Sequence, residues 1–410
     1  MRPGGRAAAH RRPRFVILVW ALVPGGTLSV LRDWVPRLAE HGDVSIVSLG
    51  PNRASLGVPT ASLGGRRSHP FRFPNVLGYV ARMTVAAVKS SRGGGATVLI
   101  PQDALATGAA AAIAARIAGA RLVVMEHGSA AAVDTERFWR ERAVGGWAWG
   151  LRQRFLRTTL LVFRRLVLPR MDLALVAGDD AEATFRSRGV GAGRLLRYRF
   201  GVDIDLFRPA SSVERADARE RWGLDEADAV IISVGRLAPE KGIDDLIAAV
   251  AGVPGSPRLL VAGEGPLRVE LERAAAAVGA AVTFVGGLER RDVASLLHAA
   301  DCFVYPALRG ANTPFAVLEA MSSGLPVVAT TAPEVHEVML SDGRGVAVAP
   351  GDRDALRAGI ARYLADRSAA TAAGAAAREY VVRLHAPAQV DEAVTELVRR
   401  LGIDNVRGGG

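Results

Sequence analysis

The chain has 410 residues, of which 50% are hydrophobic, and a formal net charge of +11. This length and apolar content are sufficient for two buried cores, so two domains are expected. The single cysteine, Cys302, excludes an internal disulfide framework and a cysteine-rich metal site. No apolar run reaches the length that would span a bilayer.

A basic segment followed by an apolar run lies between Arg11 and Trp20. Signal peptides have the same order, but no small-residue cleavage site follows, and Pro24-Gly25-Gly26 comes directly after the run. We therefore interpret the run as a buried first strand and expect a cytoplasmic protein. Gly25 and Gly26 would let the backbone approach a ligand closely.

Short, nearly continuous apolar runs alternate with helical patterns along the chain. This alternation is typical of parallel sheets that helices cover on both faces. We therefore expect an α/β fold made of two doubly wound, Rossmann-like domains. The predicted strands are 15–20, 44–49, 98–100, 122–125, 173–176, 230–234, 258–262, 282–285, 302–305 and 326–329.

Basic residues are concentrated in the first half of the chain. Residues 1–200 hold 30 Lys and Arg against 12 Asp and Glu, whereas residues 201–410 hold 22 against 29. This asymmetry indicates an anionic partner for the first half. Residues 137–170 contain nine arginines interleaved with aromatic and aliphatic residues, which is typical of an interfacial helix on an anionic membrane surface. The alternative is an arginine-rich helix on a compact domain. No nucleic-acid-binding pattern appears, so no nucleic acid partner is expected.

Residues 230–242 carry the clearest functional signal. An apolar run ends at Gly235, and Arg236 and Lys241 follow in a short loop before a helical pattern begins at Ile243. Two cations beside a helix start, at the carboxyl end of a buried strand, suit a diphosphate. Lys241 is one of two lysines among 52 basic residues, and an ammonium places a compact charge on one phosphate oxygen. The alternative is a solvated basic turn.

Residues 306–330 form a second signal that predicts a loop, a helix, a glycine stop and a strand. Thr313 suits the position before the helix, and the free backbone amides around Phe315 would point toward an anion. Glu319 follows about one turn later. A carboxylate at that place could accept two hydrogen bonds from a sugar diol.

These motifs together resemble the retaining nucleotide-sugar transferases of glycosyltransferase family 4, also called group 1 glycosyltransferases. Each motif alone is weak, whereas the set in this order is specific. The resemblance covers most of the chain and includes Pro24-Gly25-Gly26, Glu126-His127-Gly128, Gly201-Val202-Asp203, GRLAPEKG, GEGPL and LEAMSSGLPVV.

The resemblance implies a GT-B fold, in which two Rossmann-like domains face each other across the substrates. Residues 1–200 would form the acceptor-side domain and residues 201–385 the nucleotide-sugar-binding domain. Residues 386–410 would form a last helix that returns to the first domain, followed by a disordered tail.

The resemblance also implies roles for single residues. Arg236 and Lys241 would hold the donor's diphosphate and stabilise its charge as it leaves, Glu319 would bind the ribose, and the Phe315 amide would lie under the phosphates. His127 would touch the sugar; the alternative for His127 is a loop histidine bonded to the backbone. The family's anomeric retention is attributed to front-face attack, with the leaving phosphate accepting the acceptor's proton.

The expected function is therefore a retaining hexosyltransferase that moves a sugar from a nucleoside diphosphate sugar to a lipid-linked or cell-surface glycan acceptor. We expect it to be a peripheral protein at the inner face of the plasma membrane. The family usually has a further glutamate eight positions before Glu319, where this chain has Ala311. Asn312 or Thr313 would contact the sugar instead. Ala311 also motivates an alternative, a catalytically silent sugar-nucleotide-binding or partner protein of the same fold.

Asp203-Ile204-Asp205 superficially matches the acidic motif of metal-dependent transferases. It lies inside the linker match that begins at Gly201, away from the expected diphosphate loop. Arg236 and Lys241 already supply the positive charge that a metal would bring. We therefore expect no metal requirement and no cofactor apart from the sugar donor as substrate.

Overall fold

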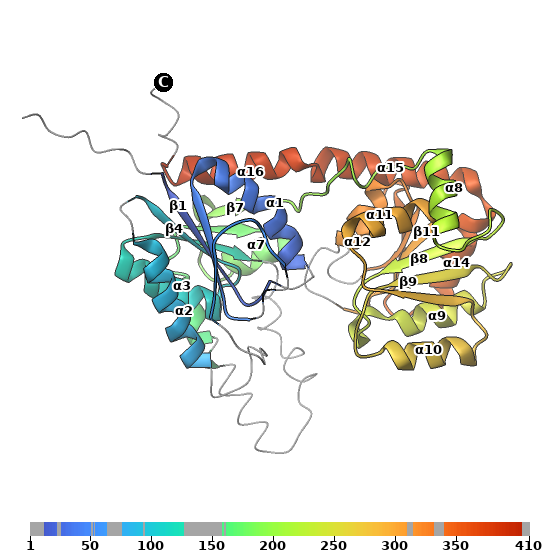
Figure 1. Ribbon diagram of the computed structural model, residues 1–410, viewed down its shortest axis with the longest axis horizontal. Coiled ribbons are helices and arrows are strands. Elements are labelled where there is room, and N and C mark those ends of the chain that lie inside the picture. The colour runs from blue at the N-terminus through green and yellow to red at the C-terminus, as the bar shows by residue number, and fades with distance from the viewer. Residues whose placement is uncertain are drawn as a thin grey trace, which may run out of the picture. The chain divides into compact units, whose positions relative to one another are not determined.

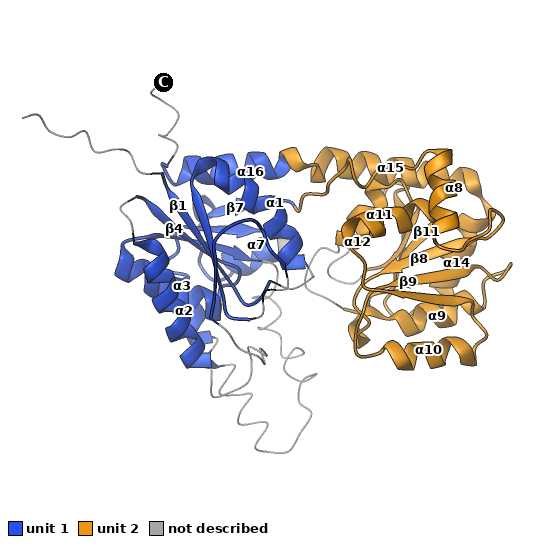
Figure 2. Cartoon of the chain, in the orientation of Figure 1, with its two compact units in different colours: residues 1–199, 389–410 blue, residues 200–388 orange. Residues whose placement is uncertain are grey.

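The computed structural model describes residues 12–22, 26–50, 52, 54–63, 76–92, 95–126, 158–159, 161–309, 315–331 and 340–403. The chain divides into two compact units (Figure 2). Unit 1 comprises Met1–Arg199 with Gln389–Gly410, and unit 2 comprises Phe200–Ala388. The acceptor-side and nucleotide-sugar-binding roles predicted for the two parts of the chain stay predictions.

Unit 1 contains a seven-stranded parallel sheet in the order β3-β2-β1-β4-β5-β6-β7 (Figure 1). Its strands are β1 (Arg14–Val19), β2 (Asp43–Ser48), β3 (Thr60–Ser62), β4 (Thr97–Pro101), β5 (Arg121–Glu126), β6 (Leu173–Val176) and β7 (Leu195–Arg197). Its helices among the described residues include α1 (Gly26–His41), α2 (Val76–Ser91), α3 (Ala106–Ala118), α7 (Asp179–Arg186), the 3-10 helix η1 (Ala192–Arg194) and most of α16 (Pro387–Arg400), and residues 161–167 are helical as well.

The last helix, α16, is tied to unit 1 at two places. Asp391 forms an ion pair with Arg37 of α1 at 2.5 Å, and Arg400 donates a hydrogen bond of 3.0 Å to the carbonyl of Leu195 in β7. The apolar side of the helix is buried, including Val394. These contacts explain why residues far apart in the sequence share one compact unit.

Unit 2 contains a six-stranded parallel sheet in the order β10-β9-β8-β11-β12-β13. Its strands are β8 (Val230–Val234), β9 (Arg258–Ala262), β10 (Val282–Gly286), β11 (Cys302–Tyr305), β12 (Val327–Thr330) and β13 (Gly345–Val348). Its helices are α8 (Ser212–Arg221), η2 (Pro239–Lys241), α9 (Ile243–Ala251), α10 (Arg268–Ala277), α11 (Arg290–Ala299), α12 (Phe315–Ser322), α14 (Arg353–Ala365) and α15 (Arg367–His385).

Helices cover both faces of the unit 2 sheet, with α9 and α10 on one face and α8, α11 and α12 on the other (Figure 1). Side chains on one face, such as Ile231 and Val304, join a core with α9, α10 and α14. Cys302 is fully buried in the same core, and burial raises the pKa of its thiol. The prediction that Cys302 is a core residue is confirmed.

All ten predicted strands are present, and the expectation of an α/β fold with two doubly wound, Rossmann-like domains is confirmed. The run after Arg11 forms β1, a buried strand. The structure adds β3, β7 and β13, which the sequence did not predict. Each of them is short and lies at the edge of its sheet, and β3 is exposed throughout. β3 thus lacks the apolar run by which buried strands were recognised, whereas β13 is apolar and was missed.

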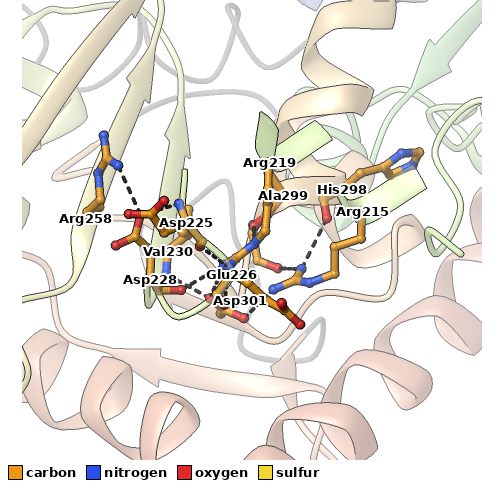
Figure 3. A network of polar contacts seen from close by, with 11 residues as sticks. Arg215, Arg219, Asp225, Glu226, Asp228, Val230, Arg258, His298, Ala299 and Asp301 are labelled. Carbon is orange, nitrogen blue, oxygen red and sulfur yellow. Dashed lines mark hydrogen bonds and ion pairs between the residues drawn. The ribbon is translucent and has the colours of Figure 1, made fainter. Parts of the chain in front are cut away.

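A buried network joins α8 to the amino-terminal ends of β8 and β11 (Figure 3). Arg219, which is almost completely buried, donates hydrogen bonds to the carbonyls of Asp225, Glu226, Asp228 and Ala299. Its guanidinium also contacts Asp301 at 3.1 Å, and Arg215 contacts the other oxygen of this carboxylate at 2.6 Å. The network lies at the opposite ends of the strands from the loops described below, and it links α8 to the segments that precede β8 and β11.

Candidate functional site

The candidate site lies at the carboxyl ends of β8 and β11 in unit 2. The chain runs outward from β8 through β9 to β10 and then returns to the other side of β8 as β11. Loops leave such a switch point in opposite directions, and ligands of open α/β sheets bind in the resulting crevice. The loop after β8 contains Arg236 and Lys241, and the helix after β11 contains Glu319.

The loop after β8 is bonded to the segment after β11. The amides of Leu308 and Arg309 donate hydrogen bonds to the carbonyl of Glu240, at 3.0 and 3.3 Å. Gly242 has φ +60, and a Cβ at this position would lie 2.3 Å from the carbonyl oxygen of Pro306. A residue with a side chain cannot make so close an approach in this conformation.

The loop after β9 also packs on the loop after β8, on the side away from β11. A Cβ on Gly263, which has φ +139, would lie 1.8 Å from the carbonyl oxygen of Gly235, and a Cβ on Gly265 would lie 2.1 Å from that of Leu237. Leu237 donates a hydrogen bond of 2.9 Å to the carbonyl of Glu264. The glycines of GEGPL and GRLAPEKG therefore let three loops fit together with their backbones in contact.

Lys241 is held against Tyr305 at the end of β11. Its Nζ donates a hydrogen bond of 2.7 Å to the Tyr305 hydroxyl and lies 5.2 Å from the centre of the ring. Tyr305 itself is buried. The lysine thus has a defined position beside the switch point.

Arg236 lies on the same loop but is largely exposed, and its guanidinium forms an ion pair with Glu240. An exposed pair four residues apart contributes only about 0.3–0.5 kcal/mol. A diphosphate carries more charge than one carboxylate and would readily compete for this guanidinium. The structure therefore brings Arg236 and Lys241 onto one loop, with Lys241 the more firmly placed of the two.

Glu319 and Phe315 lie on α12, which begins at Phe315 among the described residues. Glu319 is buried, and its carboxylate lies 3.7 Å from Arg290 of α11. The Phe315 ring packs against Phe200, with their centres 5.1 Å apart. Gly324 follows the helix with φ +74, so the predicted glycine stop is confirmed.

Several predicted site residues lie outside the described residues, namely Gly25, His127, Asn312 and Thr313, as does Ala311. Gly26 is described and is the first residue of α1, directly after the β1 segment. The roles of all these residues, and of Arg236, Lys241, Phe315 and Glu319, stay predictions.

The carboxyl edge of the unit 1 sheet carries two acidic side chains, of which the sequence analysis named Glu126 only as part of a motif and did not name Asp103. Glu126, at the end of β5, is 1% exposed. Asp103 accepts hydrogen bonds from Trp20 at 3.0 Å and from the Thr107 hydroxyl at 2.6 Å. Burial nevertheless raises the pKa of Asp103. Their closeness could not be found from a local pattern, because it depends on the pairing of β1, β4 and β5.

Among the described residues, no group of three or more His, Cys, Asp and Glu side chains is arranged to hold a metal ion. Asp203 accepts a hydrogen bond of 3.0 Å from the Leu206 amide and so closes its own turn. The absence of a metal requirement stays a prediction. In the part of the chain that is described, no helix combines the length and apolar character needed to cross a membrane.

Comparison with known proteins bears on this site. Residues 214–380 match the family model of the group 1 glycosyl transferases. The matched segment contains the loop with Arg236 and Lys241, the glycines that pack on it, and Glu319. The resemblance proposed from the sequence motifs is therefore confirmed for this part of the chain at the level of glycosyl transferases, whereas family 4 and retention stay predictions.

Curated relatives agree with the family match. The chain is 35% identical over 191 residues to a GDP-mannose-dependent monoacylated alpha-(1-6)-phosphatidylinositol monomannoside mannosyltransferase of Corynebacterium glutamicum, which covers 44% of this chain and 50% of that protein. It is 32% identical over 238 residues to the GDP-mannose-dependent alpha-(1-6)-phosphatidylinositol monomannoside mannosyltransferase of Mycobacterium tuberculosis. This match covers 54% of this chain and 61% of that protein. The chain thus spans about half of the first relative's length and three-fifths of the second's.

Solved structures resemble most of the chain in fold. HepE of Anabaena, in complex with UDP and glucose, aligns with a TM-score of 0.75 at 19% identity over 94% of this chain and 99% of its own. WaaG, a glycosyltransferase involved in lipopolysaccharide biosynthesis, aligns with a TM-score of 0.71 at 20% identity. The alignment covers 96% of this chain and 100% of WaaG. At these identities the likeness shows the fold alone, and the expected GT-B type is confirmed.

Proposed function

We propose that this chain is a retaining glycosyltransferase that moves a sugar from a nucleoside diphosphate sugar to a lipid-linked or cell-surface glycan acceptor. One observation supports the proposal: the loop after β8, with Arg236 and Lys241, and the helix that follows β11, with Glu319, both adjoin the switch point of the unit 2 sheet and lie inside the segment that matches the group 1 glycosyl transferases. Such a group can bind both the phosphates and the ribose of a nucleotide.

In this proposal Lys241 and Arg236 bind the diphosphate and stabilise the negative charge that grows as it leaves the sugar. Preorganised groups of this kind typically contribute about 10²–10³ in rate each. Lys241 is held by Tyr305 before the donor arrives, whereas Arg236 exchanges its weak contact with Glu240 for a phosphate oxygen. Glu319 accepts hydrogen bonds from the ribose, and the amide of Phe315 lies under the phosphates.

The remaining proposed groups act on the sugar and the acceptor. His127 touches the sugar, Asn312 or Thr313 takes the place of the glutamate that Ala311 replaces, and Gly25 and Gly26 admit a substrate close to the backbone. The departing phosphate accepts the proton of the acceptor hydroxyl on the same face, which would retain the anomeric configuration. No metal takes part in the proposed reaction.

The relatives indicate which substrates to test first. Both mannosyltransferases are named as GDP-mannose-dependent and as acting on phosphatidylinositol mannosides, so we propose GDP-mannose and a mannosylated glycolipid as the first pair. UDP-glucose is the second donor, because HepE has been solved with this compound. We also propose that the basic segment 137–170 holds the protein at an anionic membrane surface on the cytoplasmic side.

Thermal shift measurements with GDP, UDP and their sugar conjugates test donor binding, because a ligand that binds the folded state raises Tm. A radiolabelled transfer assay with the best donor then compares the unmodified chain with Lys241→Ala, which should abolish transfer. Arg273→Ala, on α10, is a matched control that should retain activity. NMR of the product's anomeric carbon tests retention, and activity in the presence of a chelator tests metal independence.

The second candidate is a catalytically silent sugar-nucleotide-binding or partner protein of the same fold, which Ala311 favours. It predicts a clear thermal shift with a nucleotide sugar but neither transfer nor hydrolysis with any donor. Binding without turnover across the donor panel would support this candidate, and Lys241-dependent transfer would reject it.

A further inference from the structure

Arg290 is the first residue of α11 and faces Glu319 of α12. Its Nη2 lies 3.7 Å from Oε1 of Glu319, which is too long for a hydrogen bond but close for a pair of opposite charges. The Glu319 side chain is 11% exposed. Attraction between charges is stronger in such partly buried surroundings than in water, so Arg290 affects where the carboxylate lies.

A second contact fixes the position of the Arg290 guanidinium. Its Cζ lies 5.2 Å from the centre of the Phe207 ring, which is fully buried. The Phe207 carbonyl in turn accepts a hydrogen bond of 2.5 Å from the hydroxyl of Ser322, on the same helix as Glu319. The arginine is thus held between a rigid aromatic ring and α12, so its charge has a defined place relative to Glu319.

The same surroundings do not make Arg290 a good stabilising residue. Its Nε is buried and has no hydrogen-bond partner among the described residues. An unsatisfied buried donor disfavours the folded state. Replacing both members of a buried charge pair by apolar residues is often neutral or stabilising, so the pair by itself is weak evidence for a role in stability. A role in the site explains the arginine better than a role in the core.

We propose that Arg290 is a positioning residue for nucleotide binding: it holds the Glu319 carboxylate in the orientation that receives the ribose hydroxyls. The inference rests on the proposed function, because it assumes that a nucleoside diphosphate binds at this edge of the sheet. Arg290 acts through Glu319 and does not itself touch the phosphates, which Lys241 and Arg236 bind.

The test compares a ribonucleotide with its analogue that lacks both ribose hydroxyls. Isothermal titration measures Kd for GDP or UDP, whichever gives the larger thermal shift, and for the corresponding 2′,3′-dideoxynucleotide. The unmodified chain is compared with Arg290→Met, whose side chain is of similar length and can still pack on Phe207. Arg291→Met is the matched control, because Arg291 is the exposed neighbour on the same helix.

The unmodified chain and Arg291→Met should prefer the ribonucleotide by about tenfold or more. Arg290→Met should lose about tenfold in affinity for the ribonucleotide and keep its affinity for the dideoxynucleotide, so that the preference disappears. Its Tm should fall, because the mostly buried Glu319 carboxylate loses this cation, so both Kd values are measured well below the unfolding midpoint. In a Glu319→Gln background, Arg290→Met should have no further effect, because both residues serve one contact.

An Arg290→Met variant that keeps the full preference for the ribonucleotide would overturn the proposal. Equal losses of affinity for both nucleotides would also overturn the proposal. They would mean that Arg290 contacts the phosphates or supports the structure of the whole site. If the unmodified chain binds neither nucleotide, the proposed function fails first and this inference falls with it. If the unmodified chain binds the ribonucleotide and Arg290→Met keeps the same preference for it, only the inference about Arg290 is wrong and the proposed function stands.

Discussion

The ammonium of Lys241 donates a hydrogen bond of 2.7 Å to the hydroxyl of Tyr305 and lies 5.2 Å from the centre of the same ring. Lys241 lies in the loop after β8, whereas Tyr305 is the last residue of β11. Because the tyrosine is buried, it offers the lysine a fixed support. The catalytic cation of the proposed reaction is therefore placed by a residue that has no direct role in the chemistry.

Tyr305→Phe should reduce kcat/KM with the donor about tenfold, because it removes one hydrogen bond to a charged group and leaves Lys241 less well oriented. The ring remains, so Tm should change little. Initial-rate kinetics over a range of donor concentrations provide the measurement. Tyr363→Phe, which alters a buried tyrosine on α14, is the control. Identical kinetics for Tyr305→Phe and the unmodified chain would show that Lys241 needs no such support.

Gly263→Ala should destabilise unit 2 and abolish donor binding. The new methyl group would lie 1.8 Å from the carbonyl oxygen of Gly235, and φ +139 is unfavourable for any residue with a side chain. We expect a loss of more than about 2 kcal/mol in the free energy of unfolding. Urea unfolding provides this value. Gly235→Ala is the control for stability, because its Cβ would meet open space; equal losses in the two variants would contradict the prediction.

Asp301→Ala should lower the free energy of unfolding by about 3 kcal/mol, because it leaves the buried Arg219 without its carboxylate and removes an acceptor from the amide of Val230. Donor affinity, measured well below the unfolding midpoint, should be unchanged, since the network lies away from the candidate site. Asp217→Ala alters an exposed carboxylate on α8 and should change stability by less than about 0.5 kcal/mol. A stable Asp301→Ala variant would mean that the network contributes little.

His298 should make stability depend on pH. Burial lowers the pKa of His298, although a hydrogen bond to the Arg208 carbonyl at 3.1 Å partly offsets this effect. The unfolded chain takes up the proton near pH 6.5, whereas the folded chain takes it up only at lower pH. The contribution of His298 is therefore fully present above about pH 6.5 and is lost as the pH falls through the lower folded value.

The measurement is urea unfolding of the unmodified chain and of His298→Gln at pH 7.5 and 5.5. The substitution should cost more stability at pH 7.5 than at pH 5.5, because glutamine does not titrate. A difference between the two proteins that is constant with pH would refute the assignment to His298.

Binding to an anionic membrane should depend on the end of the basic segment. Within helical residues 161–167, Val162 and Leu166 are 47% and 37% exposed and lie four positions apart, on one side of the helix. Val162→Asp with Leu166→Asp should weaken binding to vesicles that contain phosphatidylglycerol, as measured by sedimentation, with no effect on donor binding. Val213→Asp, at an exposed valine of α8, is the control. If the unmodified chain, the double variant and Val213→Asp bind the vesicles equally, residues 161–167 do not contact the membrane.

The fold was predictable where burial leaves a local pattern. β8, β9 and β11 are nearly continuous apolar runs because helices cover both faces of the sheet, and their predicted bounds agree with the structure. The edge strand β3 was not predicted, because a strand with one neighbour and exposed side chains does not need such a run.

The sequence by itself determined which charged groups the candidate site contains. Arg236 and Lys241 follow a predicted strand directly, and Glu319 lies on the helix that follows a second predicted strand. Only the tertiary structure decided how they are held: Tyr305 beneath Lys241, Arg290 beside Glu319, and the backbone of Gly235 against Gly263. A charge or a glycine is visible in the sequence, but its partner comes from another strand. That pairing depends on the order of strands in the sheet, which no local pattern contains.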